Sequence, residues 1–135
     1  MPLYICNTRA GALDGAAKTR VAQAITDIHC QVTGALASFV HAIFFEASSR
    51  WPLEDKTLSV QGTIRRGRSE QQRELIATSI QQALVSCAGV ELEHTEVEIR
   101  ETPASWVLEG GEIMPEPGAE DAWLAAQAAR RRPYV

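Results

Sequence analysis

The chain repeats one order of predicted secondary structure in its two halves, and this repeat constrains the fold most. In each half a short alternating apolar stretch is followed by a long amphipathic stretch and then by a second strand-like stretch. Equivalent points in the two halves lie about 55 residues apart. The sequence therefore predicts two tandem β-α-β units, each with a parallel strand pair joined by a right-handed crossover.

The first half carries clear signals for all three elements of its unit. Residues 2–8 alternate in polarity as a strand does. Residues 15–33 place apolar side chains at helical spacing, and Gly34 is a typical residue for ending that helix. Residues 40–45 are apolar on both faces, which predicts a strand that is covered on both sides. We assign residues 2–54 to this first unit.

The second half repeats the order with equally local signals. Residues 57–65 alternate as a strand, and Ser69 with Gln72 forms a capping box that predicts the start of a helix. Gly89 is placed to end this helix, and residues 96–99 alternate again. We assign residues 55–103 to the second unit.

The remaining segment, residues 104–135, has a weaker pattern and is expected to make subunit contacts. It predicts a tight turn, a linker and a short helix, at Gly110-Gly111, Pro115-Glu116-Pro117-Gly118 and residues 120–132 respectively. The helix would carry Trp123 and Leu124. Its end, Arg130-Arg131-Arg132, suits the negative end of a helix dipole and is read either as a solvated helix end or as an anion-binding tail.

Two such units predict an α/β (α+β) fold, with a four-stranded sheet and two helices on one of its faces. We expect residues 1–135 to form a single domain. Phe44 and Phe45 are too apolar to leave the second sheet face in water, and two helices cover only one face. The sequence therefore predicts a homo-oligomer in which the sheets pack on neighbouring subunits.

Composition excludes several classes of protein. The 135 residues include 45% hydrophobic and 22% charged residues, as in soluble globular domains, and the net charge of −4 argues against a nucleic-acid binder. The sequence has neither an apolar run long enough for a bilayer nor a basic-then-apolar leader. Its three cysteines, Cys6, Cys30 and Cys87, lack metal-ligand spacing. These features predict a cytoplasmic protein with no membrane or nucleic-acid partner.

Pro2 is the first candidate for chemistry. It follows Met1 directly, and methionine is normally removed before a small residue. Proline at a free terminus is a secondary amine, and nearby cations lower the pKa of such a group toward the range that general acid–base catalysis needs. The alternative interpretation is a strand that simply begins with proline, a position where proline is tolerated.

A cluster of arginines supplies the second candidate. Arg65, Arg66 and Arg68 lie at a strand end, immediately before the predicted helix start. Guanidinium groups bind carboxylates through paired hydrogen bonds, and a helix amino terminus favours anions. This is therefore a candidate site for a small anionic substrate, although a solvated charged turn has the same composition.

Two further residues are weaker candidates by themselves. His29 flanks the apolar stripe of the first helix, where it acts either as a site residue or as a boundary histidine with a satisfied hydrogen bond. Glu109 follows an apolar stretch and precedes the glycine pair; it is either a carboxylate with a raised pKa or an exposed turn residue. The histidines lack metal-like spacing, and the sequence has no phosphate-binding glycine loop, so we predict no metal and no cofactor.

Together these residues resemble the tautomerase superfamily, and more closely its cis-3-chloroacrylic acid dehalogenase group, whose subunit fuses two β-α-β units. The resemblance runs from Pro2 to about Trp123. It rests on four stretches in the same order: Ala24-Ile25-Thr26-Asp27-Ile28-His29, Gly62-Thr63-Ile64-Arg65-Arg66-Gly67-Arg68-Ser69, Pro103-Ala104 through Glu109-Gly110, and Pro115-Glu116-Pro117-Gly118.

The resemblance implies a role for each candidate. Pro2 corresponds to the general acid/base of the family, Glu109 to its water-activating carboxylate, and His29, Arg65 and Arg68 to its substrate-carboxylate binders. Arg66 matches no site residue. The family is typically a homotrimer in this fused form.

One position departs from the family pattern. The group has a tyrosine that positions the attacking water, and Glu98 stands at that position here. A carboxylate is a poor substitute beside an anionic substrate, because like charges repel. Glu98 could equally face solvent on its strand. Either placement weakens the case for hydrolytic dehalogenation and leaves proton transfer by Pro2 unaffected.

The sequence therefore predicts an enzyme of the tautomerase superfamily that acts on small 2-oxo, enol or unsaturated carboxylates. Keto–enol tautomerisation is the favoured reaction, and hydration is a further option. The alternatives are a cis-3-haloacrylate dehalogenase and a non-catalytic trimeric binding protein, because a fold does not fix a function.

Overall fold

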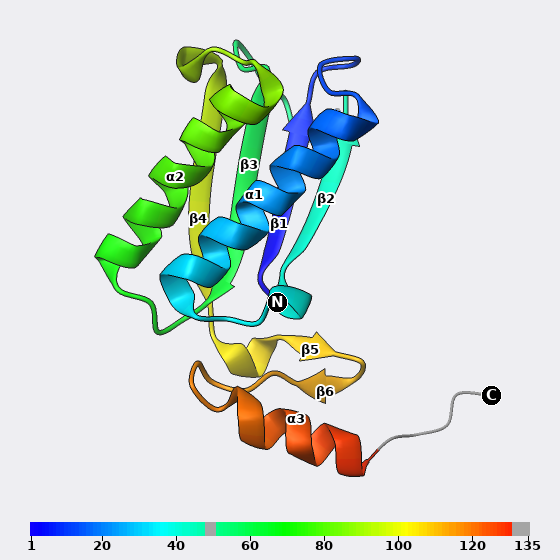
Figure 1. Cartoon of the computed structure of the whole chain (residues 1–135), viewed down its shortest axis with the longest axis vertical. Coiled ribbons are helices and arrows are strands. Elements are labelled where there is room, and N and C mark those ends of the chain that lie inside the picture. Colours follow the sequence, from blue (N-terminus) through cyan, green and yellow to red (C-terminus); the bar gives the residue numbers. More distant parts are fainter. Residues whose placement is uncertain (48–50, 131–135) are drawn as a thin grey trace, which may run out of the picture.

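Four strands form one mixed sheet, which confirms the predicted α+β class (Figure 1). The computed structural model of the protein describes residues 1–47 and 51–130. In the strand order β2-β1-β3-β4, the outer pairs β1·β2 and β3·β4 are parallel and the central pair β1·β3 is antiparallel. The strand bounds are β1 Leu3–Thr8, β2 His41–Glu46, β3 Leu58–Arg65 and β4 Thr95–Thr102.

Two long helices connect the parallel pairs and cover one face of the sheet. Helix α1 (Gly15–Thr33) ends at Gly34, which adopts the left-handed conformation with φ 74°. Helix α2 (Glu70–Ala88) begins with the predicted capping box of Ser69 and Gln72 and also ends at a left-handed glycine. These caps satisfy backbone groups that have no partner within the helix, so local sequence fixes both helices.

The main core lies between this helical layer and the sheet. Its fully buried members occupy alternating positions on β1 and β3 and one face of each helix. They are Tyr4, Cys6, Leu58, Val60, Ile64, Val21, Ile25, Ile76, Ile80 and Leu84. Burying this much apolar surface is the dominant favourable contribution to folding.

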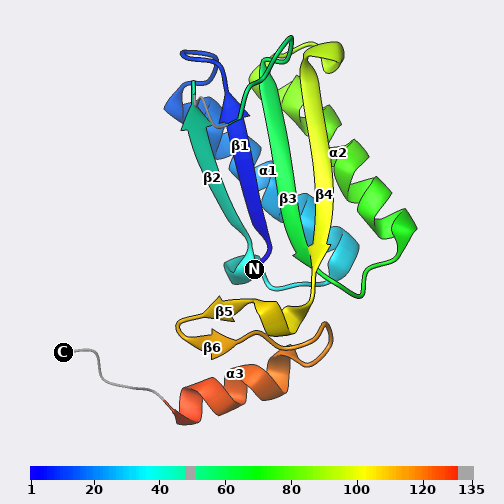
Figure 2. The same cartoon turned by 180° about the vertical axis from the view of Figure 1, so that it is seen from behind.

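Among the described residues no helix covers the second face of the sheet, as Figure 2 shows from behind. Along β2 the side chains alternate between the core and this open face, and Ile43 and Phe45 on the open face remain 45% and 38% exposed. Within one chain β2 is thus an edge strand with one uncovered face, and the predicted covering on both sides requires another subunit.

The C-terminal segment forms a small layer across one end of the sheet (Figure 1). Strands β5 (Leu108–Glu109) and β6 (Glu112–Ile113) make the predicted hairpin, and α3 (Glu120–Ala129) lies beside it. The indole of Trp123 joins the two through a 2.7 Å hydrogen bond to the Ile113 carbonyl. Residues 131 and 132 of the predicted arginine run lie outside the described residues. No helix among the described residues is both long and apolar enough to cross a bilayer.

Candidate active site

The antiparallel register of the central strands brings the amino terminus beside the arginine cluster. Leu3 pairs with Thr63 at the end of this register, and the charge of Arg65, two residues beyond Thr63, acts on the Met1 amino group. Because side chains alternate along strands, the side chain of Arg65 leaves the sheet on the same face as that of Leu3. Arg65 is only 3% exposed. The sheet itself therefore sets the first and most important contact of the site.

Pro2 is buried and its backbone is anchored at the start of β1. Its carbonyl accepts a 3.0 Å hydrogen bond from the His41 backbone N–H, next to the register pair of Leu3 and His41. In the structure Met1 precedes it, so the free amino group belongs to Met1. Consecutive Cα atoms are about 3.8 Å apart, so an amine on Pro2 would lie about one residue step from this position.

Burial and a nearby guanidinium act against the charged form of this amino group, whereas a nearby carboxylate favours it. That carboxylate is Glu109, which forms an ion pair with the group. Burial and the nearby Arg65 guanidinium lower the pKa of the Met1 amino group to about 6. Both causes act against the charged form of any amine placed here, because burial removes water and the guanidinium repels an ammonium.

Glu109 reaches the amino terminus because of the hairpin turn. Gly110 and Gly111 both have positive φ, 58° and 81°, which is the backbone geometry that two-residue hairpin turns require. The short ladder between Glu109 and Glu112 then directs this segment back across the end of the sheet. The sequence prediction of a tight turn here is confirmed.

His29 lies on the buried face of α1 and is held by Tyr4. The Tyr4 hydroxyl and His29 Nδ1 are 2.8 Å apart. Burial, followed by Arg68, Arg65 and the amino terminus, lowers the pKa of His29 to about 4, so the ring is neutral at pH 7. Burial raises the pKa of the Tyr4 hydroxyl well above its ordinary value, so it stays protonated. His29 is thus a buried neutral histidine beside the arginines and the amino terminus.

Gly62 makes room for this arrangement. A Cβ atom at this position would lie 2.5 Å from Cε1 of Tyr4 and 2.9 Å from Cδ1 of Ile99, far inside van der Waals contact. Only a residue without a side chain lets the Tyr4 ring pass over β3 toward His29. Glycine at position 62 therefore permits the contact between Tyr4 on β1 and His29 on α1.

Arg68 approaches the same region from the turn before α2. Its Nη1 lies 3.4 Å from the Thr33 carbonyl at the end of α1. Burial and the charge of Arg65 lower the pKa of Arg68, and Glu120 acts in the opposite direction. These electrostatic effects tie Arg68 to the cluster, whereas the neighbouring Arg66 is exposed.

An apolar cluster surrounds the Met1 side chain. Met1, Phe39 and Met114 are buried together, and partly buried apolar residues pack on them: Leu3, Val107, Trp123 and Leu124. The rings of Phe39 and Trp123 meet edge to face, with centroids 6.0 Å apart. Removal of Met1 would therefore free an apolar space directly beside a Pro2 amine.

Sequence reasoning missed Glu120. This residue opens α3, and its Oε1 accepts a 2.7 Å hydrogen bond from Arg65 Nη2. Arg65 Nη1 also donates to the Pro115 carbonyl at 2.5 Å. No periodicity links residues 65 and 120; the only available signal was an acidic residue in the first turn of a predicted helix.

Glu98 does not join the cluster within one chain. It is exposed on β4 and forms a salt bridge with Arg100, whose Nε lies 3.0 Å from Glu98 Oε1. The pair projects from the open face of the sheet, because the alternating Val97 and Ile99 side chains pack on the core. A role for Glu98 in positioning water stays a prediction.

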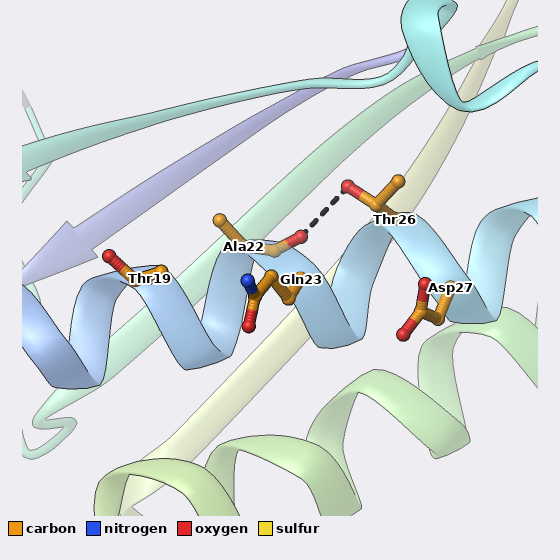
Figure 3. A pocket seen from close by; sticks show the side chains of 5 residues that line it. All are labelled: Thr19, Ala22, Gln23, Thr26 and Asp27. Atoms are coloured by element: carbon orange, nitrogen blue, oxygen red, sulfur yellow. Dashed lines mark hydrogen bonds between the residues drawn. The ribbon is translucent and has the colours of Figure 1, made fainter.

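Other hollows and polar groups lie away from these residues. One hollow of about 320 Å³ on the outside of α1 is lined by Thr19, Ala22, Gln23, Thr26 and Asp27 (Figure 3). At the start of β4, ligand atoms of Glu91, Glu93 and His94 lie within 4.8 Å of one another. Exposed carboxylates commonly gather in this way without a metal, so this group carries no assignment.

Several solved structures match this fold over most of the length of the chain. A member of the cis-3-chloroacrylic acid dehalogenase family, called N1, is 27% identical with a TM-score of 0.84, and the match covers 96% of each chain. The native protein Ps01740 is 33% identical with a TM-score of 0.71, over 80% of this chain and 100% of its own. A fused 4-OT protein, 21% identical with a TM-score of 0.72 over 84% of this chain and 95% of its own, shares the fold.

No family model and no curated protein matches the sequence. The solved structures nevertheless agree with the tandem β-α-β architecture and with the resemblance of the sequence motifs. These matching proteins belong to a superfamily of small α+β enzymes. The chain belongs to the tautomerase superfamily and resembles its cis-3-chloroacrylic acid dehalogenase group.

Proposed function

We propose that the protein is a tautomerase that interconverts enol and keto forms of small 2-oxo carboxylates, with Pro2 as the general base after removal of Met1. The observation that carries this proposal is the environment of the terminal amine. Burial and Arg65 lower the pKa of the Met1 amino group to about 6, and the same two causes would lower the pKa of an amine on Pro2 and favour its neutral form at pH 7. A neutral amine accepts a proton, as a general base must.

The reaction needs no group beyond the chain and the substrate. Pro2 would remove the enol hydroxyl proton and return a proton to the adjacent carbon, which converts the enol to the ketone. A developing enolate oxygen would be stabilised by the arginines, whose charge lies in a partly buried site where electrostatic interactions are strong. Glu109, which contacts the amino terminus, would orient the ammonium that forms during each turnover.

Three side chains would bind the substrate carboxylate. Arg65 and Arg68 offer guanidinium N–H groups, and neutral His29 offers one more N–H. If His29 Nδ1 accepts a hydrogen bond from the protonated Tyr4 hydroxyl, its proton resides on Nε2, which is then available as a donor. The apolar cluster around Met1 would receive the substrate side chain once Met1 is removed.

The same lowered pKa separates this reaction from the runner-up, a cis-3-haloacrylate dehalogenase. Addition of water across a double bond requires an acid that protonates carbon, and an amine with a pKa of about 6 is mostly unprotonated at pH 7. The similarity to a cis-3-chloroacrylic acid dehalogenase family member is the reason to name this reaction as the alternative. Release of halide from cis-3-chloroacrylate, in the wild type or after Glu98→Tyr, would favour it.

We also propose that the protein is a homotrimer. The apolar side chains on the open sheet face, including Ile43 and Phe45, require a cover that the described residues of one chain do not supply. The fused 4-OT relative is described as a symmetric trimer. A trimer that binds carboxylates without catalysis is the third option, and retention of Met1 would support it.

The test replaces Pro2 with alanine and measures ketonisation of phenylenolpyruvate. Intact mass first establishes that Met1 is absent from both proteins. We expect Pro2→Ala to lower kcat/KM by at least about 100-fold, because general acid–base catalysis contributes 10²–10⁴-fold, while circular dichroism is unchanged. Equal activity of the variant and the wild type would rule out the mechanism. Absence of activity from the processed wild type would favour the binding protein.

A further inference from the structure

Glu120 lies where a substrate-binding arginine would otherwise carry an uncompensated charge. Its Oε1 is 2.7 Å from Arg65 Nη2, and the two side chains are 17% and 2% exposed. An ion pair this buried is screened little by water, so Glu120 offsets part of the charge that Arg65 presents, while Arg65 still lowers the pKa of the amino terminus and of His29. Arg65 keeps guanidinium N–H groups that are free to bind an oxygen, since only two of its five take part in the bonds to Glu120 and Pro115.

The Glu120 carboxylate is fixed rather than free to swing away. Its Oε2 accepts a 2.8 Å hydrogen bond from the Gly118 backbone N–H, while Oε1 is bound to Arg65. Burial disfavours its charge, but the hydrogen bond from Arg65, backbone N–H groups and the charge of Arg65 together hold the pKa of Glu120 below its ordinary value. Glu120 is therefore a fixed negative charge beside Arg65.

Arg68 differs from Arg65 in this respect. Among residues 1–47 and 51–130 no carboxylate lies within salt-bridge distance of Arg68; its Nη1 faces the Thr33 carbonyl at 3.4 Å. The site thus presents one arginine whose charge is partly offset by a carboxylate and one whose charge is not. His29 adds no charge at neutral pH, because it is buried as the neutral ring.

We propose that Glu120 is a specificity-determining residue that restricts the site to substrates with a single carboxylate. This inference rests on the proposed carboxylate-binding role of the same site. One carboxylate is matched by the uncompensated charge of Arg68. A second carboxylate would lie near the Glu120 charge and near the apolar side chains of Phe39 and Met114, where an unpaired charge is unfavourable.

The test compares two 2-oxo acids of equal length, 2-oxopentanoate and 2-oxoglutarate, which differ in a terminal methyl or carboxylate. Calorimetry measures the Kd of each for Met1-free wild type, Glu120→Gln and the control Asp121→Asn. Asp121 is the exposed neighbour on α3, so the control removes the same charge outside the site. We expect the wild type to bind 2-oxopentanoate at least about tenfold more tightly. Glu120→Gln should reduce that preference about tenfold, mainly by tightening 2-oxoglutarate, and Asp121→Asn should leave it unchanged.

Three results would overturn the inference. A wild type that binds 2-oxoglutarate as tightly as 2-oxopentanoate contradicts it without any variant, even if Glu120→Gln fails to fold. An unchanged preference in a folded Glu120→Gln protein contradicts the role of Glu120 alone. Failure of all proteins to bind either acid removes the carboxylate site itself. Binding is measured without turnover, so it tests Glu120 independently of the reaction. If Glu120→Gln shifts the preference while Pro2→Ala keeps full activity, the proposed proton transfer by Pro2 is rejected and the role of Glu120 in specificity stands.

Discussion

Neighbouring arginines in one turn have different surroundings and therefore different roles. Arg65 is buried at the end of β3 and paired with Glu120. Arg66 is exposed, and only its backbone N–H is tied down, by a 2.7 Å bond to the Thr102 carbonyl. Arg68 is partly buried against the end of α1. All three have the same side-chain chemistry, and the fold gives each a different exposure and different partners.

We predict that Arg68→Ala raises KM for phenylenolpyruvate about 10- to 100-fold, because a hydrogen bond to a charged group contributes about 1.5–3 kcal/mol. Arg66→Ala is the matched control, since it removes the same charge two residues away, and its KM should match the wild type. Steady-state kinetics on Met1-free proteins measures both. Equal effects of the two substitutions would mean that the turn acts only through its overall charge.

At the scale of elements, the β5–β6 hairpin holds Glu109 against the amino terminus. Gly111 has φ 81°, and Gly11 at the opposite end of the sheet has φ 72°; a Cβ on either would meet no atom within 4 Å. We predict that alanine at either position costs about 1 kcal/mol of stability through backbone strain. Only Gly111→Ala should also lower kcat.

Thermal unfolding and kinetics on the two glycine variants provide the comparison. Similar shifts in Tm with a kcat loss confined to Gly111→Ala would support the positioning of Glu109 by the hairpin. A kcat loss of the same size in Gly11→Ala would assign the effect to general destabilisation instead.

The elements were predictable because their signals are local. Gly34, Gly89 and the Ser69 capping box mark helix ends with groups only a few residues apart, and the observed helices begin and end there. The glycine pair likewise predicts the hairpin turn. Strand bounds were less certain: the predicted strand at residues 96–99 extends over Thr95–Thr102 in the structure, because pairing with β3 continues the strand beyond the alternating pattern.

The site was predictable only in part because it depends on contacts between distant segments. The motif resemblance predicts His29, Arg65 and Arg68 as site residues, and the structure brings these three residues close together. The register of β1 and β3 accounts for the approach of Arg65 to the amino terminus. Glu120 and the passage of Tyr4 over Gly62 required coordinates. Both are packing relationships between residues far apart in sequence, and neither leaves a periodic signal.

At the scale of the whole molecule, the proposed trimer depends on the open sheet face. Ile43 is 45% exposed there, whereas Leu75 is 54% exposed on α2 in the helical layer that covers the opposite face. We predict that Ile43→Lys converts the trimer to a folded monomer, because it places a charge in an apolar interface. Leu75→Lys, with a similarly exposed apolar residue, should leave the trimer intact.

Analytical ultracentrifugation distinguishes a single 14.7 kDa chain from three, and circular dichroism checks the fold. A wild type that sediments as a monomer, or an Ile43→Lys protein that remains trimeric, would contradict packing through this face.

The central claim is that a free Pro2 amine in this site is neutral at physiological pH and acts as a base. A base works only when deprotonated, so kcat/KM must fall as pH drops through its pKa. The decisive measurement is therefore the pH dependence of kcat/KM for phenylenolpyruvate with protein shown by mass to lack Met1. The account predicts a rise with pH and a plateau by neutral pH, because the burial and the Arg65 charge that lower the pKa of the Met1 amino group to about 6 would act on the Pro2 amine in the same direction. A rate that instead declines from pH 7 upward, as for a catalytic acid, would contradict it.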